Sequence, residues 1–551
     1  MRTDASFATA TDSTTAAETG TVASMDFSFV NVNTPTLHVT TSPRHESIGL
    51  GAGLTQTQVC VNMKARELPD DDEQRAPIDL IVGLDVSGSM NNGKLELCKK
   101  TLLMLLRVLY PKDRFGLICF AENAKIEVPV QRMTEANKAR CVEKVRALRT
   151  RGCTNMSAAV GLVCEEMRQI DIPNEVQTVF FLTDGHANAG ISKADALVDF
   201  TKNCFTHESM TLQGTEGADD QPSGSRFRFR RPSQPKNVQE DAKPAAVMMD
   251  TDAKPRSPIT LCTFGYGSDH DADLLRNMSD VVPGGSYYFV ENDSNVGAAF
   301  GDALGGVLSV VAQNVVVSLT VPPEAKAKGV EIVDVHHESK VKRENGSYTV
   351  VVGDFYAEES RDVLFEVKLA NSNGTNDRIH HVGVAVSYTD TLLKAPAKAH
   401  PTACLISRPL GTDMSLPNPH VEVNLTRLNA TKAMAQANSL AQARNWDGAR
   451  ACLQRAKGEV KAAWASAPSR HREDLASLEA DFVHLEGGFS SAAMYEAQGS
   501  KMVSNMRSSH VKQRAMRSSV GSSWDRGSAP RPAAYQSKKK CAMQSKFSSS
   551  S

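Results

Sequence analysis

The sequence has no long hydrophobic run. Hydrophobic residues make up 41% of its 551 residues, but no stretch reaches the length of about 18 apolar residues that a membrane-spanning helix needs. The first 24 residues lack the apolar core of a secretory signal, and they carry three acids, which transit peptides avoid: Asp4, Asp12 and Glu18. We therefore expect no membrane span, a disordered segment over residues 1–24, and a protein of the cytoplasm or the nucleus.

The composition shows neither an excess of one charge nor paired cysteines. Lys and Arg number 62 against 63 Asp and Glu, a net charge of -1, which gives no reason to expect stable binding of nucleic acid. The 11 cysteines are an odd and scattered set without a Cys-x-x-Cys pair. We expect them to be reduced thiols, as in an intracellular protein.

What the sequence does contain is a polar loop directly after a buried strand. The near-continuous apolar run 78–84 predicts a strand that is covered on both faces. Asp85, Ser87 and Ser89 follow at alternate positions in a tight, glycine-containing loop. Carboxylate and hydroxyl oxygens suit a hard cation such as Mg²⁺, although two serines before a helix can also serve as caps.

Two later stretches favour a metal site over helix-capping serines. Thr154 stands where a loop enters an amphipathic helical run, and a second buried-strand pattern, 176–183, ends at Asp184. The carboxyl ends of parallel strands meet at one edge of a sheet, and such sheets bind ligands where the strand order reverses. We therefore expect the oxygens of the three loops to converge.

The order Asp-x-Ser-x-Ser, then Thr, then Asp-Gly resembles the von Willebrand factor A domain with its metal-ion-dependent adhesion site. The resemblance implies that Ser87, Ser89 and Thr154 coordinate Mg²⁺ or Mn²⁺, with Asp85 and Asp184 as direct or water-mediated partners. In that family the ion keeps an open position for a Glu or Asp carboxylate of a partner protein. The resemblance thus implies metal-dependent protein binding.

Longer segments narrow the resemblance to intracellular A-domain proteins, among them the plant wavy-growth-type ubiquitin ligases. The similar segments include Gly93-Lys94-Leu95 and the stretch 265–271, and the similarity covers roughly residues 62–309. Those ligases carry a Cys/His-rich RING module ahead of the A domain, and such zinc modules need paired cysteines. Residues 1–75 contain one cysteine, Cys60, so we expect the RING module to be missing here.

Strands alternating with helices predict an α/β fold, a doubly wound and mostly parallel sheet between helices. Changes in composition set the remaining boundaries. We expect strands that complete a sandwich at 25–75, the A domain at 76–310 with a disordered insertion at 207–257, an antiparallel β-sandwich at 311–410, a helical hairpin at 420–500, and a basic, Ser-rich disordered tail at 501–551.

Catalytic motifs are scarce. The sequence has no phosphate-binding GxxxxGK[ST] loop, no GxSxG elbow and no HExxH pair. A bound Mg²⁺ can support hydrolysis, and His186 lies beside Asp184, but a single histidine near a metal loop is more often structural. We expect a non-enzymatic scaffold or adaptor. The alternative is a substrate-recruiting subunit of a ubiquitin ligase that uses a separate RING partner.

Overall fold

The computed structural model describes residues 35–68, 75–91, 93–206, 259–267, 269–290, 293–370, 378–515 and 535–548. The segments expected to be disordered at 1–24 and 207–257 lie outside the described residues. From Thr36 on, the described residues belong to one structural unit, Thr36–Ser551. No helix in these ranges is both long enough and apolar enough to cross a membrane.

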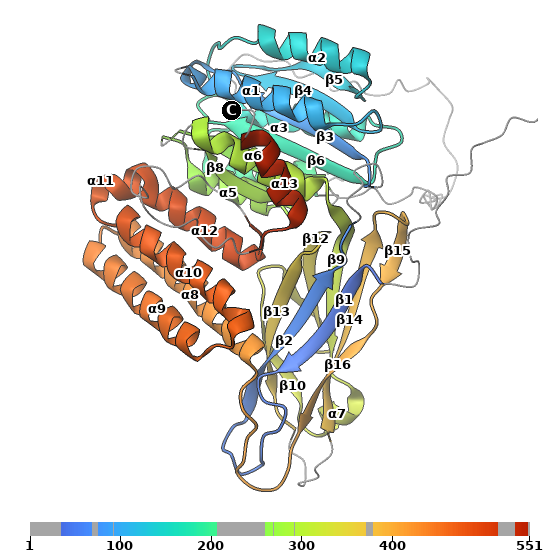
Figure 1. The fold of residues 1–551 in the computed structure, drawn as a ribbon, viewed down its shortest axis with the longest axis vertical. Helices are drawn as coiled ribbons and strands as arrows, with labels where there is room; N and C mark the ends of the chain where they lie inside the picture. The colour runs from blue at the N-terminus through green and yellow to red at the C-terminus, as the bar shows by residue number, and fades with distance from the viewer. Residues whose placement is uncertain are drawn as a thin grey trace, which may run out of the picture. The chain divides into compact units, whose positions relative to one another are not determined.

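A six-stranded sheet forms the α/β part, in the order β5-β4-β3-β6-β7-β8 (Figure 1). All neighbouring strands pair in parallel except β4 and β5. All residues of the two central strands, β3 and β6, are buried, as expected for continuous apolar runs between two helical layers. The strands are β3 (Ile78–Asp85), β4 (Arg114–Phe120), β5 (Ala124–Arg132), β6 (Val176–Thr183), β7 (Ile259–Tyr266) and β8 (Ser286–Val290).

Helices cover both faces of this sheet, which confirms the predicted fold class. Alternate residues of β3 point to opposite cores: Leu80 and Val82 pack with α1, α2 and α6, while Ile81 packs with α3, α4 and α5. The helices are α1 (Lys94–Val108), α2 (Glu135–Ala147), α3 (Met156–Arg168), α4 (Ala194–Phe205), α5 (Ala272–Asp280) and α6 (Asp293–Val307).

The antiparallel part consists of two sheets that share one apolar core. Strand β2, which precedes the α/β part in the chain, pairs with β13, which follows it. One sheet has the order β1-β2-β13-β10, with β1 (Leu37–Pro43), β2 (Gln56–Ala65), β10 (Glu331–His336) and β13 (Ser360–Lys368). The other has the order β11-β12-β9-β14-β15, and β16 also pairs with β14; its strands are β9 (Val310–Thr320), β11 (Lys340–Lys342), β12 (Tyr348–Tyr356), β14 (Arg378–Asp390), β15 (Ala395–Lys398) and β16 (Thr402–Ser407). The short helix α7 (Pro323–Ala327) lies between β9 and β10 in the chain.

The C-terminal part is helical and extends further than we predicted. Its elements are α8 (Pro419–Gln442), α9 (Trp446–Ser466), α10 (Ser469–Gly488), α11 (Ala492–Met494), a π turn (Tyr495–Gly499), α12 (Ser500–Lys512) and α13 (Lys538–Ser548). All of α12 except its first residue, and all of α13, fall in the range 501–551, where we expected a disordered tail, so that expectation is wrong for these two helices. Residues 516–534, between the two helices, lie outside the described part of the chain.

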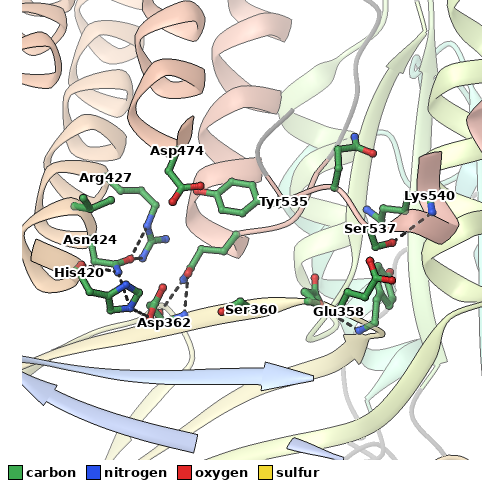
Figure 2. A pocket seen from close by; sticks show the side chains of 15 residues that line it. Glu358, Ser360, Asp362, His420, Asn424, Arg427, Asp474, Tyr535, Ser537 and Lys540 are labelled. Carbon is green, nitrogen blue, oxygen red and sulfur yellow. Dashed lines mark hydrogen bonds and ion pairs between the residues drawn. The ribbon is translucent and has the colours of Figure 1, made fainter. Parts of the chain in front are cut away.

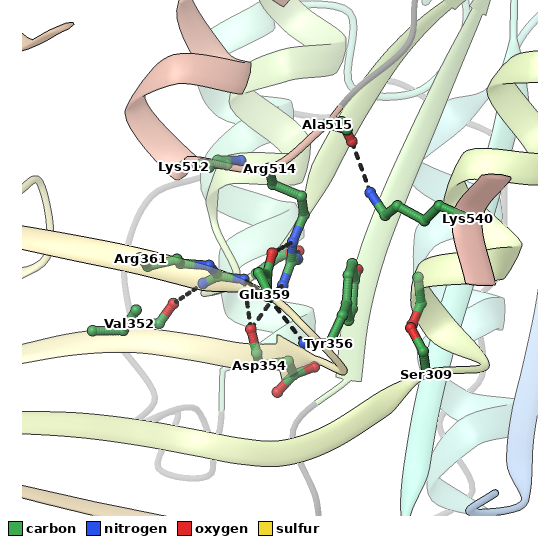
Figure 3. A network of polar contacts seen from close by, with 12 residues as sticks. Ser309, Val352, Asp354, Tyr356, Glu359, Arg361, Lys512, Arg514, Ala515 and Lys540 are labelled. Atoms are coloured by element: carbon green, nitrogen blue, oxygen red, sulfur yellow. Dashed lines mark hydrogen bonds and ion pairs between the residues drawn. The ribbon is translucent and has the colours of Figure 1, made fainter. Parts of the chain in front are cut away.

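Two cations of this region, one following α12 and one in α13, are buried against distant carboxylates. Arg514, directly after α12, donates to Glu359 Oε1 at 2.9 Å and to the carbonyl of Gly284 at 2.9 Å (Figure 3). Lys540 of α13 donates to Asp302 Oδ2 of α6 at 2.9 Å. Both cationic side chains are buried, with Arg514 and Lys540 each about 1% exposed. We predicted a disordered tail because composition suggests that these cations are solvated. Composition contains no information on partners that are distant in the sequence.

Candidate functional site

The candidate site lies at the carboxyl edge of the parallel sheet. Strands β3 and β6 end there next to each other, and the strand order reverses at this point because β4 lies on one side of β3 and β6 on the other. Crevices of this kind are where open α/β sheets bind ligands. Asp85 is the last residue of β3, and Asp184 directly follows β6.

The first loop is organised by Asp85, which is fully buried. Its Oδ1 accepts the backbone N–H of Ser87 at 2.8 Å, and its Oδ2 accepts the hydroxyl of Thr183 at 2.7 Å. The hydroxyls of Ser87 and Ser89 lie 3.0 Å apart. A single turn of 3₁₀ helix, Gly88–Met90, then leads toward α1. The structure thus brings Asp85, Ser87 and Ser89 together and connects them to the end of β6.

Backbone hydrogen bonds join the second loop to the first. The N–H of Arg151 donates to the carbonyl of Val86 at 2.6 Å, and the N–H of Gly88 donates to the carbonyl of Gly152 at 3.0 Å. Gly152 has a φ of 62°, a left-handed conformation that glycine adopts without strain. Thr154 follows two residues later and is buried.

The third loop is connected to the second through Asn188. Its side-chain Oδ1 accepts the N–H of Thr154 at 2.7 Å, and the carbonyl of Thr154 accepts the N–H of Asn188 at 3.1 Å. The turn itself depends on Gly185, whose φ is 81° and whose Cα lies close to the backbone of Asp271. The three loops are therefore held together by a continuous set of hydrogen bonds.

The electrostatics of the site are unbalanced. Burial, together with a smaller contribution from the nearby Asp184, raises the pKa of Asp85 to about 6, and the hydrogen bonds from Ser87 and Thr183 oppose this rise. Lys94 Nζ lies 3.3 Å from Asp184 Oδ2, but the other oxygen, Oδ1, is buried and has no hydrogen-bond partner among the described residues. An unpaired carboxylate oxygen beside hydroxyl oxygens fits a hard divalent cation. The donor set therefore suits Mg²⁺ or Mn²⁺.

Lys94 and His186 complete the surroundings. Lys94 also contacts Asp269 Oδ1 at 3.1 Å, so its ammonium group bridges two carboxylates. His186 is exposed, and its Nε2 contacts the backbone carbonyl of Asp269 rather than Asp184. This placement gives no support to His186 as a catalytic base acting through a metal-bound water.

Sequence reasoning missed several residues that shape the site. Thr183 bonds Asp85, Asn188 positions Thr154, and Lys94 contacts Asp184. Only Thr183 had a usable signal, a hydroxyl at the last position of a strand before an acidic loop. Of the five predicted ligands, Ser89 alone is exposed, and the second loop adds the exposed Gly152 and Cys153.

Comparison with known families and proteins agrees with this geometry. Residues 80–186 match the family model of the von Willebrand factor type A domain. Among curated proteins, the chain is 25% identical over 450 residues to the E3 ubiquitin-protein ligase WAVH1 of Arabidopsis thaliana, covering 78% of this chain and 54% of the relative. It is 23% identical over 348 residues to the E3 ubiquitin-protein ligase WAV3 of the same plant, covering 61% and 38%. The chain thus spans about half or less of these relatives.

Solved structures extend the match beyond the α/β part. A von Willebrand factor type A protein from Catenulispora acidiphila superposes with a TM-score of 0.58 at 15% identity, covering 86% of this chain and 98% of that chain. The ArnB paralog VWA2 from Sulfolobus acidocaldarius gives a TM-score of 0.50 at 13% identity, with the same coverage. At these identities the likeness concerns the fold alone.

Proposed function

Residues 80–186 lie in a von Willebrand factor type A domain, and on that premise we propose that this protein is a metal-dependent binding module. Asp85, Ser87, Ser89, Thr154 and Asp184 hold Mg²⁺ or Mn²⁺ in this proposal, and the ion accepts a carboxylate from a protein partner. The observation that carries the proposal is the buried Oδ1 of Asp184, which has no partner among the described residues and lies at the edge where the three loops meet.

Charge supports a divalent ion at this place. Asp85 and Asp184 bring two negative charges into a buried site, and Lys94 supplies one positive charge, shared with Asp269. The hydroxyls of Ser87, Ser89 and Thr154 add neutral oxygens of the kind that Mg²⁺ and Mn²⁺ accept. A hard cation with a remaining open position attracts a further carboxylate, so an acidic side chain of the partner is the fitting ligand.

A second function follows from the relatives. Two proteins whose printed names are E3 ubiquitin-protein ligases align with a large part of this chain. We propose as the alternative that this intracellular chain recruits substrates for a ubiquitin ligase and that a separate RING partner performs the transfer. Both proposals use the same metal site and differ in what the bound complex does next.

Calorimetric titration of the full chain with Mg²⁺ and Mn²⁺ tests the metal. We expect a binding heat for the wild type and none for Asp85→Asn, which keeps the shape of the side chain but removes its charge. Asp195→Asn is the matched control, since Asp195 is an exposed acid on α4 of the same domain. Equal binding heats from the wild type and Asp85→Asn would show that Asp85 does not hold a metal ion, and would contradict the proposal.

Partner binding separates the two proposals. Proteins captured from a lysate by the wild type in Mg²⁺ are compared with those captured in chelator and with those captured by Asp85→Asn. A ubiquitination assay on the captured material, with and without the chain, then distinguishes a recruiting subunit from a plain scaffold. Ubiquitination that depends on the chain and on Mg²⁺ supports the ligase alternative, and ubiquitination that does not change removes it.

A further inference from the structure

A cysteine, an aspartate and a histidine, side chains of the types that bind metals, meet on the outer face of the β1-β2-β13-β10 sheet. Asn62 of β2 is directly opposite Asp362 of β13, and Cys60 is opposite Leu364. Residues two apart on a strand share a face, so Cys60 and Asp362 point the same way. His420, in the first turn of α8, reaches down to this face (Figure 2).

The three side chains converge closely. His420 Nε2 is 2.6 Å from Asp362 Oδ1, and Cys60 Sγ is 3.2 Å from the same oxygen. One donor atom from each of the three residues lies within 4.8 Å of the other two. Asn62 Nδ2 also donates to Asp362 Oδ1, at 3.0 Å, so three donors crowd onto a single oxygen. The thiol sulfur, the imidazole nitrogen and the carboxylate oxygen are therefore close enough for their lone pairs to meet on one ion once the thiol and the imidazole nitrogen have lost their protons.

We propose that Cys60, Asp362 and His420 bind a zinc ion, independently of the Mg²⁺ site at the sheet edge. Thiolate sulfur, imidazole nitrogen and carboxylate oxygen are the ligands that zinc prefers, whereas Mg²⁺ avoids sulfur and nitrogen. With a thiolate, a carboxylate and a neutral imidazole, a dication leaves the group without net charge. The proton of the Cys60 thiol passes to solvent when the ion binds, and Nε2 of His420, which faces Asp362, gives up its proton as well, so that a neutral imidazole with its proton on Nδ1 turns the lone pair of Nε2 to the ion.

The geometry needs only a small adjustment. Ligand atoms of a tetrahedral zinc ion lie about 3.4 Å apart, given bond lengths of about 2.0 to 2.3 Å. The Cys60 to Asp362 distance of 3.2 Å is already close to that spacing. The hydrogen bond of 2.6 Å between His420 and Asp362 has to lengthen by less than 1 Å. His420 is a partly exposed residue at a helix start, so a change of its side-chain rotamer suffices.

A cavity provides the fourth coordination position. Asp362 and His420 line a cavity of about 230 Å³ between β13, α8, α10 and the start of α13 (Figure 2). The charged groups on its wall include Asp474, Glu358, Arg427 and Lys540. On the other side Cys60, Leu364 and Val421 form a small apolar cluster, which keeps the sulfur away from water. Zinc with three protein ligands and one open position is the arrangement of reactive or ligand-binding zinc sites.

Such an ion would fasten α8 to the sandwich and leave one position open to a small ligand or water. Two strands and a helix supply the ligands, separated by 302 and 58 positions in the sequence. Because these ligands are distant in the sequence, a search for Cys-x-x-Cys pairs does not detect the site.

Cobalt replacement tests the proposal on the full chain. The protein is stripped with chelator, kept in excess Mg²⁺, and titrated with Co²⁺, whose bond to a thiolate gives a charge-transfer absorption band. Bound zinc is measured by mass spectrometry after gel filtration. We expect about one equivalent of zinc and a thiolate band in the wild type, and binding weakened about tenfold or more in Cys60→Ser and in His420→Gln.

The controls separate this site from other cysteines and from the Mg²⁺ site. Cys404→Ser changes another buried cysteine of the sandwich, and Asp85→Asn changes the sheet edge. Both should keep the zinc and the cobalt band. Cys60→Ser could lose zinc because the sheet folds poorly. His420→Gln tests the same site without changing the sheet, because His420 lies at the start of a helix. A wild type without the thiolate band, or a band that His420→Gln leaves unchanged, would overturn the proposal and show a hydrogen-bonded cluster only.

Discussion

Two buried carboxylates, Glu359 and Asp184, differ in how completely they are paired. Glu359 accepts hydrogen bonds on both oxygens, from Arg514 at 2.9 Å and from Arg361 at 2.7 Å. Asp184 contacts Lys94 with one oxygen, and its other oxygen has no partner in the described part of the chain. A buried charge is stable only when paired and hydrogen-bonded. Glu359 is therefore complete as it stands, whereas Asp184 leaves an acceptor for a cation.

The pKa values follow the same division. Glu359 is buried, which raises its pKa, but Arg361 and Arg514 lower it to about 2. Asp85, the neighbour of Asp184 in the candidate site, has no cationic partner of this kind among the residues that the structure describes, and burial raises its pKa to about 6. At these two places the difference is one of pairing: Glu359 has its full set of cationic partners, whereas the two acids at the sheet edge share a single lysine. Four predictions test this difference.

The largest effect is expected for Arg514→Met. This change keeps much of the side-chain volume but leaves Glu359 with one cationic partner, Arg361, and removes the guanidinium that lies over the Tyr356 ring (Figure 3). Breaking a buried ion pair from one side costs about 3 to 5 kcal/mol. The free energy of unfolding in urea measures the loss. The control is Arg507→Met, whose partly exposed pair with Glu338 is worth about 0 to 1 kcal/mol, and equal losses in both variants would contradict the prediction.

Acid should weaken the same centre. The folded-state pKa of Glu359 lies below its ordinary value of 4.5, at about 2, so the unfolded chain binds more protons in between. The lowered pKa of Glu359 therefore adds about 3 kcal/mol to the free energy of unfolding above pH about 4.5. This contribution is lost as the pH falls toward 2. Unfolding curves at several acidic pH values check this. Arg514→Met should show a shallower loss, and a slope identical to that of the wild type would rule Glu359 out as the cause.

The fold of the sheet and the candidate ligands were accessible from the sequence because their signals are local. Asp85, Ser87 and Ser89 lie within five positions, directly after a run of buried strand residues. Thr154 and Asp184 each follow a recognisable change between strand, loop and helix. Parallel strands then bring these loops to one edge as a matter of geometry. The fold class is confirmed, and the role of these residues as metal ligands stays a prediction.

The last two helices, α12 and α13, were not accessible from the sequence, because the residues that hold them in place are distant in the chain. Arg514 and Glu359 are 155 positions apart, and Lys540 and Asp302 are 238 apart. Counting charges between 501 and 551 treats each cation as solvated, and no rule of composition identifies its acid. One signal was present in α6, where Gly297, Gly301 and Gly305 recur every four residues and so form one face of a helix.

Magnesium should stabilise the protein through the incompletely paired acids. A ligand present at about 100 times its dissociation constant raises the free energy of unfolding by about 2.7 kcal/mol. Asp85→Asn should lose this gain, and Asp195→Asn should keep it. In chelator, Asp85→Asn should change the stability little, because the removal of a buried charge offsets the loss of the acceptor for the Thr183 hydroxyl. Denaturant unfolding with and without Mg²⁺ measures these effects, and an equal gain in Asp85→Asn would place the ion elsewhere.

The smallest effect concerns the docking of α13 on α6, which lie side by side in Figure 1. A methyl group at Gly301 would come within 2.7 Å of the backbone of Gln544, so Gly301→Ala must push α13 away. Overpacking of this kind costs about 1 to 3 kcal/mol, and hydrogen exchange of the α13 amides should rise while that of the central sheet stays slow. Gly458→Ala is the matched control, because a Cβ there meets nothing within 4 Å and alanine favours a helix by about 1 kcal/mol over glycine. Unchanged exchange in Gly301→Ala would mean that the ion pair of Lys540 with Asp302, and not the close approach of the two helices, holds α13 in place.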